Sequence, residues 1–191
     1  SMPKIFSDTD RTNIRESLLV IGRKALEKNS YKNISVADIA TDAGIAKGTF
    51  YNFFPSKEVF FYEIMLQIRD ENRMAFAEFI ESPTRENAYN LFYERYTTKK
   101  TIYDYFTTDE LKIIFRRLPH KQKEADENSL ELAKKVISAC TDKKSIKAEV
   151  VVNLMNIAAS VSAEREFLLP DSYNETIAVI AKAITDYIFE K

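Results

Sequence analysis

Glycine is scarce in this chain of 191 residues: it occurs only at positions 22, 44 and 48, and there are only five prolines. The strands of a sandwich or barrel are joined by many tight corners, and those corners draw heavily on glycine. So few turn-forming residues favour an all-helical protein. A hydrophobic share of 45% and a charged share of 30% are those of an ordinary globular chain, which is long enough to bury a sizeable core.

The same counts exclude several functional classes. Three glycines at these positions cannot form a GxGxxG dinucleotide fingerprint or a GxxxxGK phosphate loop. The single cysteine, Cys140, and the single histidine, His120, exclude a Cys/His zinc cluster and a disulfide framework, so we expect no metal and no cofactor. There is no run of 18 apolar residues and no apolar segment behind a basic N-terminus, so neither a membrane span nor a signal peptide is expected. One free thiol suits a reducing cytoplasm.

The charges are distributed unevenly along the chain. Residues 1–57 hold nine Lys/Arg against six Asp/Glu, a net charge of +3, whereas the remainder carries 19 against 23, a net of −4. A basic N-terminal segment indicates that this end of the molecule meets a polyanion. An asymmetry of this size also arises by chance, so the charge alone leaves both interpretations open.

Apolar residues at helical spacing predict a first helix over about 8–28, with Ser7 or Thr9 as its N-cap. Ser35 is expected to cap a short second helix. Ser56 is expected to cap a long helix that reaches Glu81, and Ser82 to cap another that has Pro83 at its first position. The remaining predicted helices cover about 46–52, 83–98, 100–106, 109–118, 122–141, 145–168 and 173–190.

The segment ISVADIATDAGIAKGTFY, residues 34–51, has the pattern of a helix-turn-helix. Ala40 is small where the two helices would cross, and Gly44 permits the positive φ that ends the first of them. Ile45 and Phe50 are apolar on the side expected to be buried. By itself the pattern also fits a simple helical corner without DNA binding.

The motif continues past this segment. Ile39-Ala40, Ala43-Gly44-Ile45 and Lys47-Gly48-Thr49-Phe50-Tyr51, followed by Phe54 and Ser56-Lys57-Glu58, closely resemble the N-terminal signature of the TetR family of bacterial transcriptional regulators. The resemblance covers about residues 10–63. It implies an all-α protein of about nine helices, with a three-helix DNA-binding domain over 1–57 and a helical ligand-binding and dimerisation domain over 58–191.

The resemblance also implies roles for individual residues. Lys47 and Gly48 would lie on the major groove, and Lys57 would contact the DNA backbone. The full set of expected DNA-binding residues is Ser35, Thr41, Ala46, Lys47, Gly48, Thr49, Tyr51, Asn52 and Lys57. Ala46 departs from the Ser or Thr that relatives usually carry, and Phe53 replaces a common Tyr or His. Alternatives remain at Gly48, which would allow close approach either to the first helix or to DNA, and at Thr49, which would face solvent if it did not contact DNA.

The middle of the chain is rich in aromatic residues. Tyrosine combines an apolar ring with a polar hydroxyl, a combination favoured in small-molecule pockets. The resemblance implies an inducer pocket in this region, and the residues expected to line it are Phe92, Tyr96, Tyr103, Phe106 and Met155. The alternative is an ordinary helical core. His120 and Cys140 are expected to have no chemical role.

The last two predicted helices each carry an apolar stripe. The first stripe is Ile146, Val150, Leu154, Ile157 and Val161, and the second is Ile177, Ile180, Ile184 and Ile188. The resemblance implies that this pair of helices meets its twin in a homodimer. Packing onto the chain's own core is the alternative explanation for part of each stripe.

Together these observations predict a cytoplasmic, homodimeric, ligand-responsive transcriptional regulator. We expect it to be a repressor that a small-molecule inducer releases from a pseudo-palindromic DNA operator. The alternative is a helical homodimeric interaction protein without sequence-specific DNA binding. An enzyme is disfavoured because the sequence offers no second histidine, no nucleotide loop and no metal-binding set.

Overall fold

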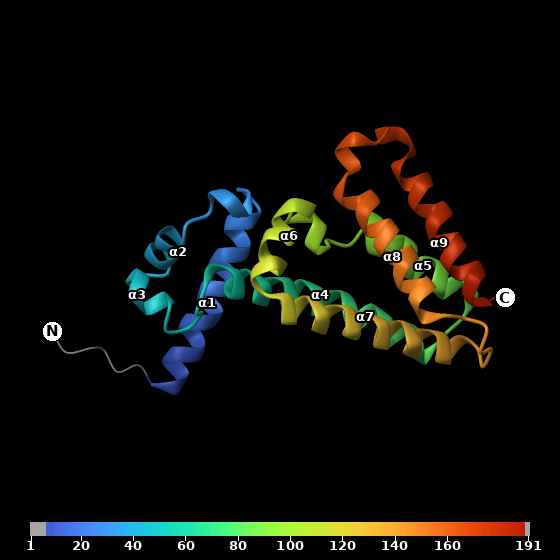
Figure 1. Cartoon of the computed structure of the whole chain (residues 1–191), viewed down its shortest axis with the longest axis horizontal. Coiled ribbons are helices and arrows are strands. Elements are labelled where there is room, and N and C mark those ends of the chain that lie inside the picture. Colours follow the sequence, from blue (N-terminus) through green and yellow to red (C-terminus); the bar gives the residue numbers. More distant parts are fainter. Residues whose placement is uncertain (1–6, 190–191) are drawn as a thin grey trace. The chain divides into compact units, whose positions relative to one another are not determined.

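The structure is a computed structural model that describes residues 7–189, and every regular element in that range is helical (Figure 1). The described residues contain nine α-helices and four short 3₁₀ helices, with no strand among them. The predicted all-α fold is therefore confirmed.

The chain divides into two compact units, residues 1–67 and residues 68–191. Helix α4, Lys57–Glu81, begins in the first unit and ends in the second, so it is the covalent connection between them. The boundary after residue 57 that the resemblance implies, between a DNA-binding and a ligand-binding domain, stays a prediction.

The N-terminal unit contains short helices with well-defined ends. Its elements are α1 (Asp8–Leu26), η1 (Tyr31–Asn33), α2 (Val36–Asp42), α3 (Lys47–Phe50) and the first part of α4. Ser7 caps α1 in a capping box with Asp10, and the Ser35 hydroxyl accepts from the Asp38 N–H at the start of α2. The Ser56 hydroxyl accepts from the Val59 N–H, 3.1 Å away, so the cap predicted for α4 is also confirmed.

Aromatic rings fill the core of this unit. Phe50, Phe54 and Phe60 contact one another with ring centroids 4.8–5.5 Å apart, and all three side chains are fully buried. Phe50 and Phe54 are therefore core residues. They connect the end of α3 to the first turns of α4, which places the helix-turn-helix on a rigid support.

The C-terminal unit is a bundle built on the second part of α4. Its elements are α5 (Arg85–Thr97), η2 (Ile102–Asp104), α6 (Thr108–Arg117), α7 (Pro119–Cys140), α8 (Ala148–Ala163), η3 (Arg165–Phe167), η4 (Pro170–Ser172) and α9 (Tyr173–Phe189). Helix α9 packs along α5, and α8 packs on both α7 and α9. The main core of this unit lies among α4, α5, α7, α8 and α9.

The N-cap predicted for α5 is wrong. Thr84, not Ser82, caps this helix: its hydroxyl accepts from the Asn87 N–H at 3.1 Å, and Pro83 lies before the helix. Ser82 instead closes the end of α4, since its N–H donates to the Phe79 carbonyl at 3.0 Å. Two capping residues stand two positions apart here, and the choice between them depends on where the preceding helix ends.

Three other predicted helices are shorter than expected. The segment 46–52 is helical only over Lys47–Phe50, 100–106 contains only the 3₁₀ turn η2, and 145–168 is α-helical only over Ala148–Ala163. The predicted helix 122–141 starts earlier, because Pro119 takes the first helical position. The predicted end of the last helix at residue 190, like Lys4 of the basic N-terminal segment, lies outside the described residues.

Candidate nucleic-acid interface

The turn between α2 and α3 has the geometry that its glycine permits. Gly44 has φ +69°, its N–H donates to the Thr41 carbonyl at 2.9 Å, and the Ile45 N–H donates to the Ala40 carbonyl at 2.9 Å. These two bonds are the Schellman arrangement that ends a helix through one left-handed residue. Ala40 is buried. The local basis of the predicted helix-turn-helix is therefore confirmed.

Ala46 is the N-cap of α3, and its backbone has the extended conformation of that position, with φ −72° and ψ 148°. The methyl side chain has no oxygen to accept from the first turn, which an N-cap Ser or Thr would supply. Helix α3 therefore has no side-chain capping hydrogen bond at its N-terminus, although the backbone of Ala46 has the N-cap conformation.

The residues predicted to bind DNA are mostly on the surface. Seven are exposed: Ser35, Thr41, Ala46, Lys47, Gly48, Tyr51 and Asn52. Thr49 and Lys57 are half-buried. The structure thus gathers the exposed members on α2, α3 and the residues that flank them, within one helix-turn-helix. Contact with DNA stays a prediction for all nine.

Tyr51 and Gly48 are the members with the most informative surroundings. The Tyr51 side chain is 44% exposed, and its ring stands edge-on to the buried ring of Phe50 at 5.4 Å, which fixes its direction. A methyl group at position 48 would meet no described protein atom within 4 Å. Close approach of α3 to another helix therefore does not require Gly48.

Lys57 is engaged within the protein. Its ammonium donates to the Tyr31 carbonyl oxygen at 2.6 Å and lies 4.2 Å from the centroid of the Tyr31 ring. The Tyr31 hydroxyl in turn donates to Glu58 Oε1 at 3.3 Å. The helix-turn-helix pattern, which begins at residue 34, does not include Tyr31. A large aromatic residue in an otherwise polar connection was the signal that it missed.

Arginines of α1 also lie against the aromatic rings of this unit. The Arg11 guanidinium lies 5.3 Å from the centroid of Phe53, just beyond α3, and Arg15 lies 5.2 Å from that of Phe54. Arg15 also forms an ion pair with Glu63, which offsets its charge. Arg11 is an exposed cation close to α3 in space that the helix-turn-helix pattern did not include.

The five residues predicted to line a ligand pocket fall into different parts of the second unit. Tyr96 and Tyr103 pack together with Ala158, Ala159 and Ile177 in one small cluster. Phe92 and Met155 belong to the main core, and Phe106 is buried. The Tyr96 hydroxyl joins the two clusters by donating to the Met155 carbonyl at 3.0 Å.

The electrostatic surroundings of Tyr103 are mixed. Burial raises the pKa of its phenol, and the neighbouring Tyr96 raises it further, while Arg69 and Arg95 oppose the shift. The phenol is therefore neutral at physiological pH. It adds an apolar ring and a neutral hydroxyl to the small cluster.

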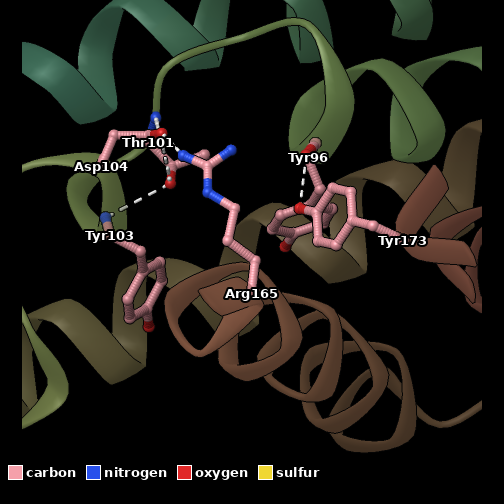
Figure 2. Close-up of polar contacts among 6 residues, drawn as sticks. All are labelled: Tyr96, Thr101, Tyr103, Asp104, Arg165 and Tyr173. Atoms are coloured by element: carbon pink, nitrogen blue, oxygen red, sulfur yellow. Dashed lines mark hydrogen bonds and ion pairs between the residues drawn. The ribbon is translucent and has the colours of Figure 1, made fainter. Parts of the chain in front are cut away.

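Side chains tie η2 to the connection between α8 and α9 (Figure 2). Arg165 forms an ion pair with Asp104, and the Tyr173 hydroxyl donates to the Tyr96 carbonyl at 2.8 Å. Asp104 also accepts from the Thr101 N–H at 2.7 Å, which caps η2. The ion pair and the cap hold η2 in place, and the Tyr173 bond joins the start of α9 to the last turns of α5.

The remaining candidates for chemistry have ordinary surroundings. His120 is exposed in the first turn of α7. Cys140 is half-buried, and burial raises the pKa of its thiol to about 11, which makes it a poor nucleophile. Residues 7–189 contain no group of three or more His, Cys, Asp or Glu that could hold a metal ion. In the same range, no helix is both long and apolar enough to span a membrane.

An all-helical chain with an exposed helix after a Gly-containing turn has the architecture of helix-turn-helix DNA-binding proteins. Residues 18–64 match the family model described as bacterial regulatory proteins, tetR family. The N-terminal part of the chain is therefore similar to the DNA-binding domain of TetR-family regulators.

The curated relatives that the chain matches are transcriptional regulators. HTH-type transcriptional regulator EthR of Mycobacterium tuberculosis strain H37Rv is 32% identical over 93 residues, which are 45% of this chain and 43% of that protein. EthR of Mycolicibacterium smegmatis is 45% identical over 42 residues, 22% of this chain and 19% of that protein. The match thus spans less than half the length of these relatives.

The fold is similar over a longer range than the sequence. The solved structure of fatty acid degradation regulator FadR from Bacillus halodurans superposes with a TM-score of 0.54, covering 90% of this chain and 94% of that one. Sequence identity over this superposition is 12%. At this level of identity the likeness concerns the fold alone.

Proposed function

We propose that this protein is a homodimeric transcriptional repressor that a small-molecule inducer releases from a pseudo-palindromic operator. The observation that carries the proposal is the exposure of the predicted DNA-contacting residues around one Schellman turn, on a domain that matches the family model. The proposal assigns no catalytic step to the chain, and its DNA target implies action in the bacterial cytoplasm.

Each part of the exposed surface has a role in this proposal. Lys47 reaches a phosphate or a guanine edge, and Thr49, Tyr51 and Asn52 lie along the groove and the adjoining backbone. Gly48 lets α3 approach the bases closely. Ser35, Thr41 and Ala46 lie at the ends of the two helices, where the DNA backbone passes.

The homodimer is proposed to form through α8 and α9. Part of the apolar stripe on α9 packs in the core of the protomer itself, because Ile177, Ile184 and Ile188 are buried there. Both helices nevertheless expose apolar side chains, with Ile157 52% and Val179 65% exposed. These exposed residues support a second copy as the partner.

The inducer is proposed to bind in the second unit, near Tyr96, Tyr103 and Met155. A ligand weakens DNA binding only by as much as it prefers the DNA-incompetent state over the competent one. Helix α4 is the element through which we expect that preference to reach the DNA-binding unit, since it belongs to both.

The test is selection of the purified protein against a random duplex pool, followed by a salt titration on the enriched sequence. We expect an enriched pseudo-palindrome and a steep fall of affinity with salt, because each phosphate contact releases counterions. Tyr51→Ala should weaken binding without unfolding the protein. Lys123→Ala, on the exposed surface of α7, is the control that should bind like wild type.

The opposite outcome would be equally clear. If folded, dimeric protein enriches no sequence, the DNA-binding assignment is wrong and the interaction-protein alternative takes its place. A Tyr51→Ala variant with wild-type affinity would contradict the assigned contact surface alone.

A further inference from the structure

Tyr31 attaches the connection between α1 and α2 to the first turn of α4. Its carbonyl accepts from the Lys57 ammonium, its ring lies beneath that ammonium, and its hydroxyl donates to Glu58. We refer to Tyr31, Lys57 and Glu58 as the Tyr31 clamp. All three residues belong to the N-terminal unit.

Two of the three clamp residues are buried, and Lys57 is half-buried. Tyr31 is 4% exposed and Glu58 is 8% exposed, and the Tyr31 ring stands edge-on to Phe61 at 5.2 Å. A hydrogen bond between buried polar groups is costly to break when one partner is removed. To reach outward to a phosphate, the Lys57 ammonium would have to weaken both its bond to the carbonyl and its contact with the ring.

The position of the clamp along the chain connects it to the DNA-binding surface. Tyr31 opens η1, and η1 is followed within two residues by Ser35, the N-cap of α2. Fixing η1 against α4 therefore fixes where α2 begins. Helix α3 follows α2 through the Gly44 turn, so a shift at the start of α2 displaces the whole exposed surface.

We propose that Tyr31 and Lys57 are positioning residues for DNA binding, and that Lys57 acts through Tyr31 rather than by contacting a phosphate. This inference rests on the proposed function. It replaces the backbone contact expected for Lys57 with an internal role. It also adds Tyr31, which no DNA-binding motif singled out.

The salt dependence of binding to the selected duplex separates the two roles. Affinity falls as salt rises, so the slope of log affinity against log salt is negative. Loss of one phosphate contact makes this slope less steep by about 0.9. Loss of a positioning contact lowers affinity equally at every salt concentration and leaves the slope unchanged. We expect Lys57→Met to weaken binding about tenfold with an unchanged slope, the size of effect typical for loss of a charge-assisted hydrogen bond. Lys47→Met is the comparison variant and should make the slope less steep.

Variants at the other two clamp residues test the internal half of the inference. Tyr31→Phe keeps the ring and the carbonyl but removes the hydroxyl that donates to Glu58. This variant should bind the duplex more weakly, with the slope of its salt dependence unchanged. Glu58→Gln keeps an acceptor for that hydroxyl and should bind close to wild type. Amide hydrogen exchange of residues 31–36 in the full chain should accelerate in Lys57→Met, a readout that needs no DNA.

Each result has one meaning. A slope that is less steep by about 0.9 in Lys57→Met would identify a phosphate contact and overturn the inference. Wild-type affinity in Lys57→Met, or unchanged exchange of residues 31–36, would overturn it as well. If the wild-type protein shows no salt-sensitive duplex binding, the proposed function itself fails.

Discussion

Position 48 separates the requirements of the fold from those of DNA binding. A methyl group there meets no described protein atom within 4 Å, and alanine is a better helix former than glycine by about 1 kcal/mol. We expect Gly48→Ala to keep or slightly raise the melting temperature. Operator affinity should fall, with a loss of binding free energy like that of a lost base contact, about 1–3 kcal/mol. Thermal denaturation and duplex titration measure the two effects. Unchanged affinity would mean that α3 does not approach the bases at this residue.

Gly22 has the opposite surroundings, although it also lies in a helix. A methyl group at this position would lie 2.4 Å from Phe60 Cζ and 2.8 Å from Ile64 Cδ1, both in the buried core. Gly22→Ala should therefore lower the free energy of unfolding by about 1–3 kcal/mol, which outweighs the gain in helix propensity. Urea denaturation measures this, with Gly48→Ala as the matched control. A stabilised Gly22→Ala variant would show that α1 and α4 can move apart at no cost.

At the scale of the element, α3 is a short helix whose N-cap is an alanine. The Ala46 backbone already has the cap conformation, so a hydroxyl placed there can accept from the first turn without rearrangement. We expect Ala46→Ser to raise the free energy of unfolding by about 1 kcal/mol, and Ser35→Ala, which removes the existing cap of α2, to lower it by a similar amount. Chemical denaturation of both variants is the measurement. A destabilised Ala46→Ser variant would contradict this account of the cap.

Helix ends were predicted well wherever the signal is local. Ser7, Ser35 and Ser56 cap the helices that the sequence assigned to them, and Gly44 adopts the positive φ expected of it. A capping hydroxyl binds an N–H only two or three residues away, so neighbouring residues contain the information. The exception is Ser82, because Thr84 offers the same chemistry two positions later.

At the scale of the whole molecule, the proposed dimer makes the sharpest prediction. Ile157 and Val179 are exposed in the protomer, so Ile157→Glu with Val179→Glu should leave the protomer folded but bring charges into an apolar interface. We expect light scattering to show a monomer at micromolar concentration, and operator affinity to fall because the two half-sites are no longer linked. Met74→Glu, at an α4 residue that is 67% exposed, is the control. A double variant that remains dimeric would place the interface elsewhere.

Some features of the second unit depend on contacts between residues far apart in the chain. The residues predicted to line one pocket divide between two clusters, with Phe92 in the main core and Tyr96 and Tyr103 in the smaller one. Helical spacing identifies the apolar side of α5, but the helix that packs against each turn of it is set by the tertiary structure. The α9 stripe shows the same limit, since burial of Ile184 follows from α9 packing along α5.

The sequence by itself determined the fold class, the helix-turn-helix and the exposed residues around it, because scarce glycine, helical spacing and capping residues act over a few positions. Only the tertiary structure decided what Lys57 contacts, since its acceptor is the carbonyl of Tyr31, 26 positions earlier in the chain. A backbone carbonyl leaves no mark on residue type, so no sequence pattern reveals it. The long-range contacts that place one helix against another determine which charged side chains are held within the protein and which remain on its surface.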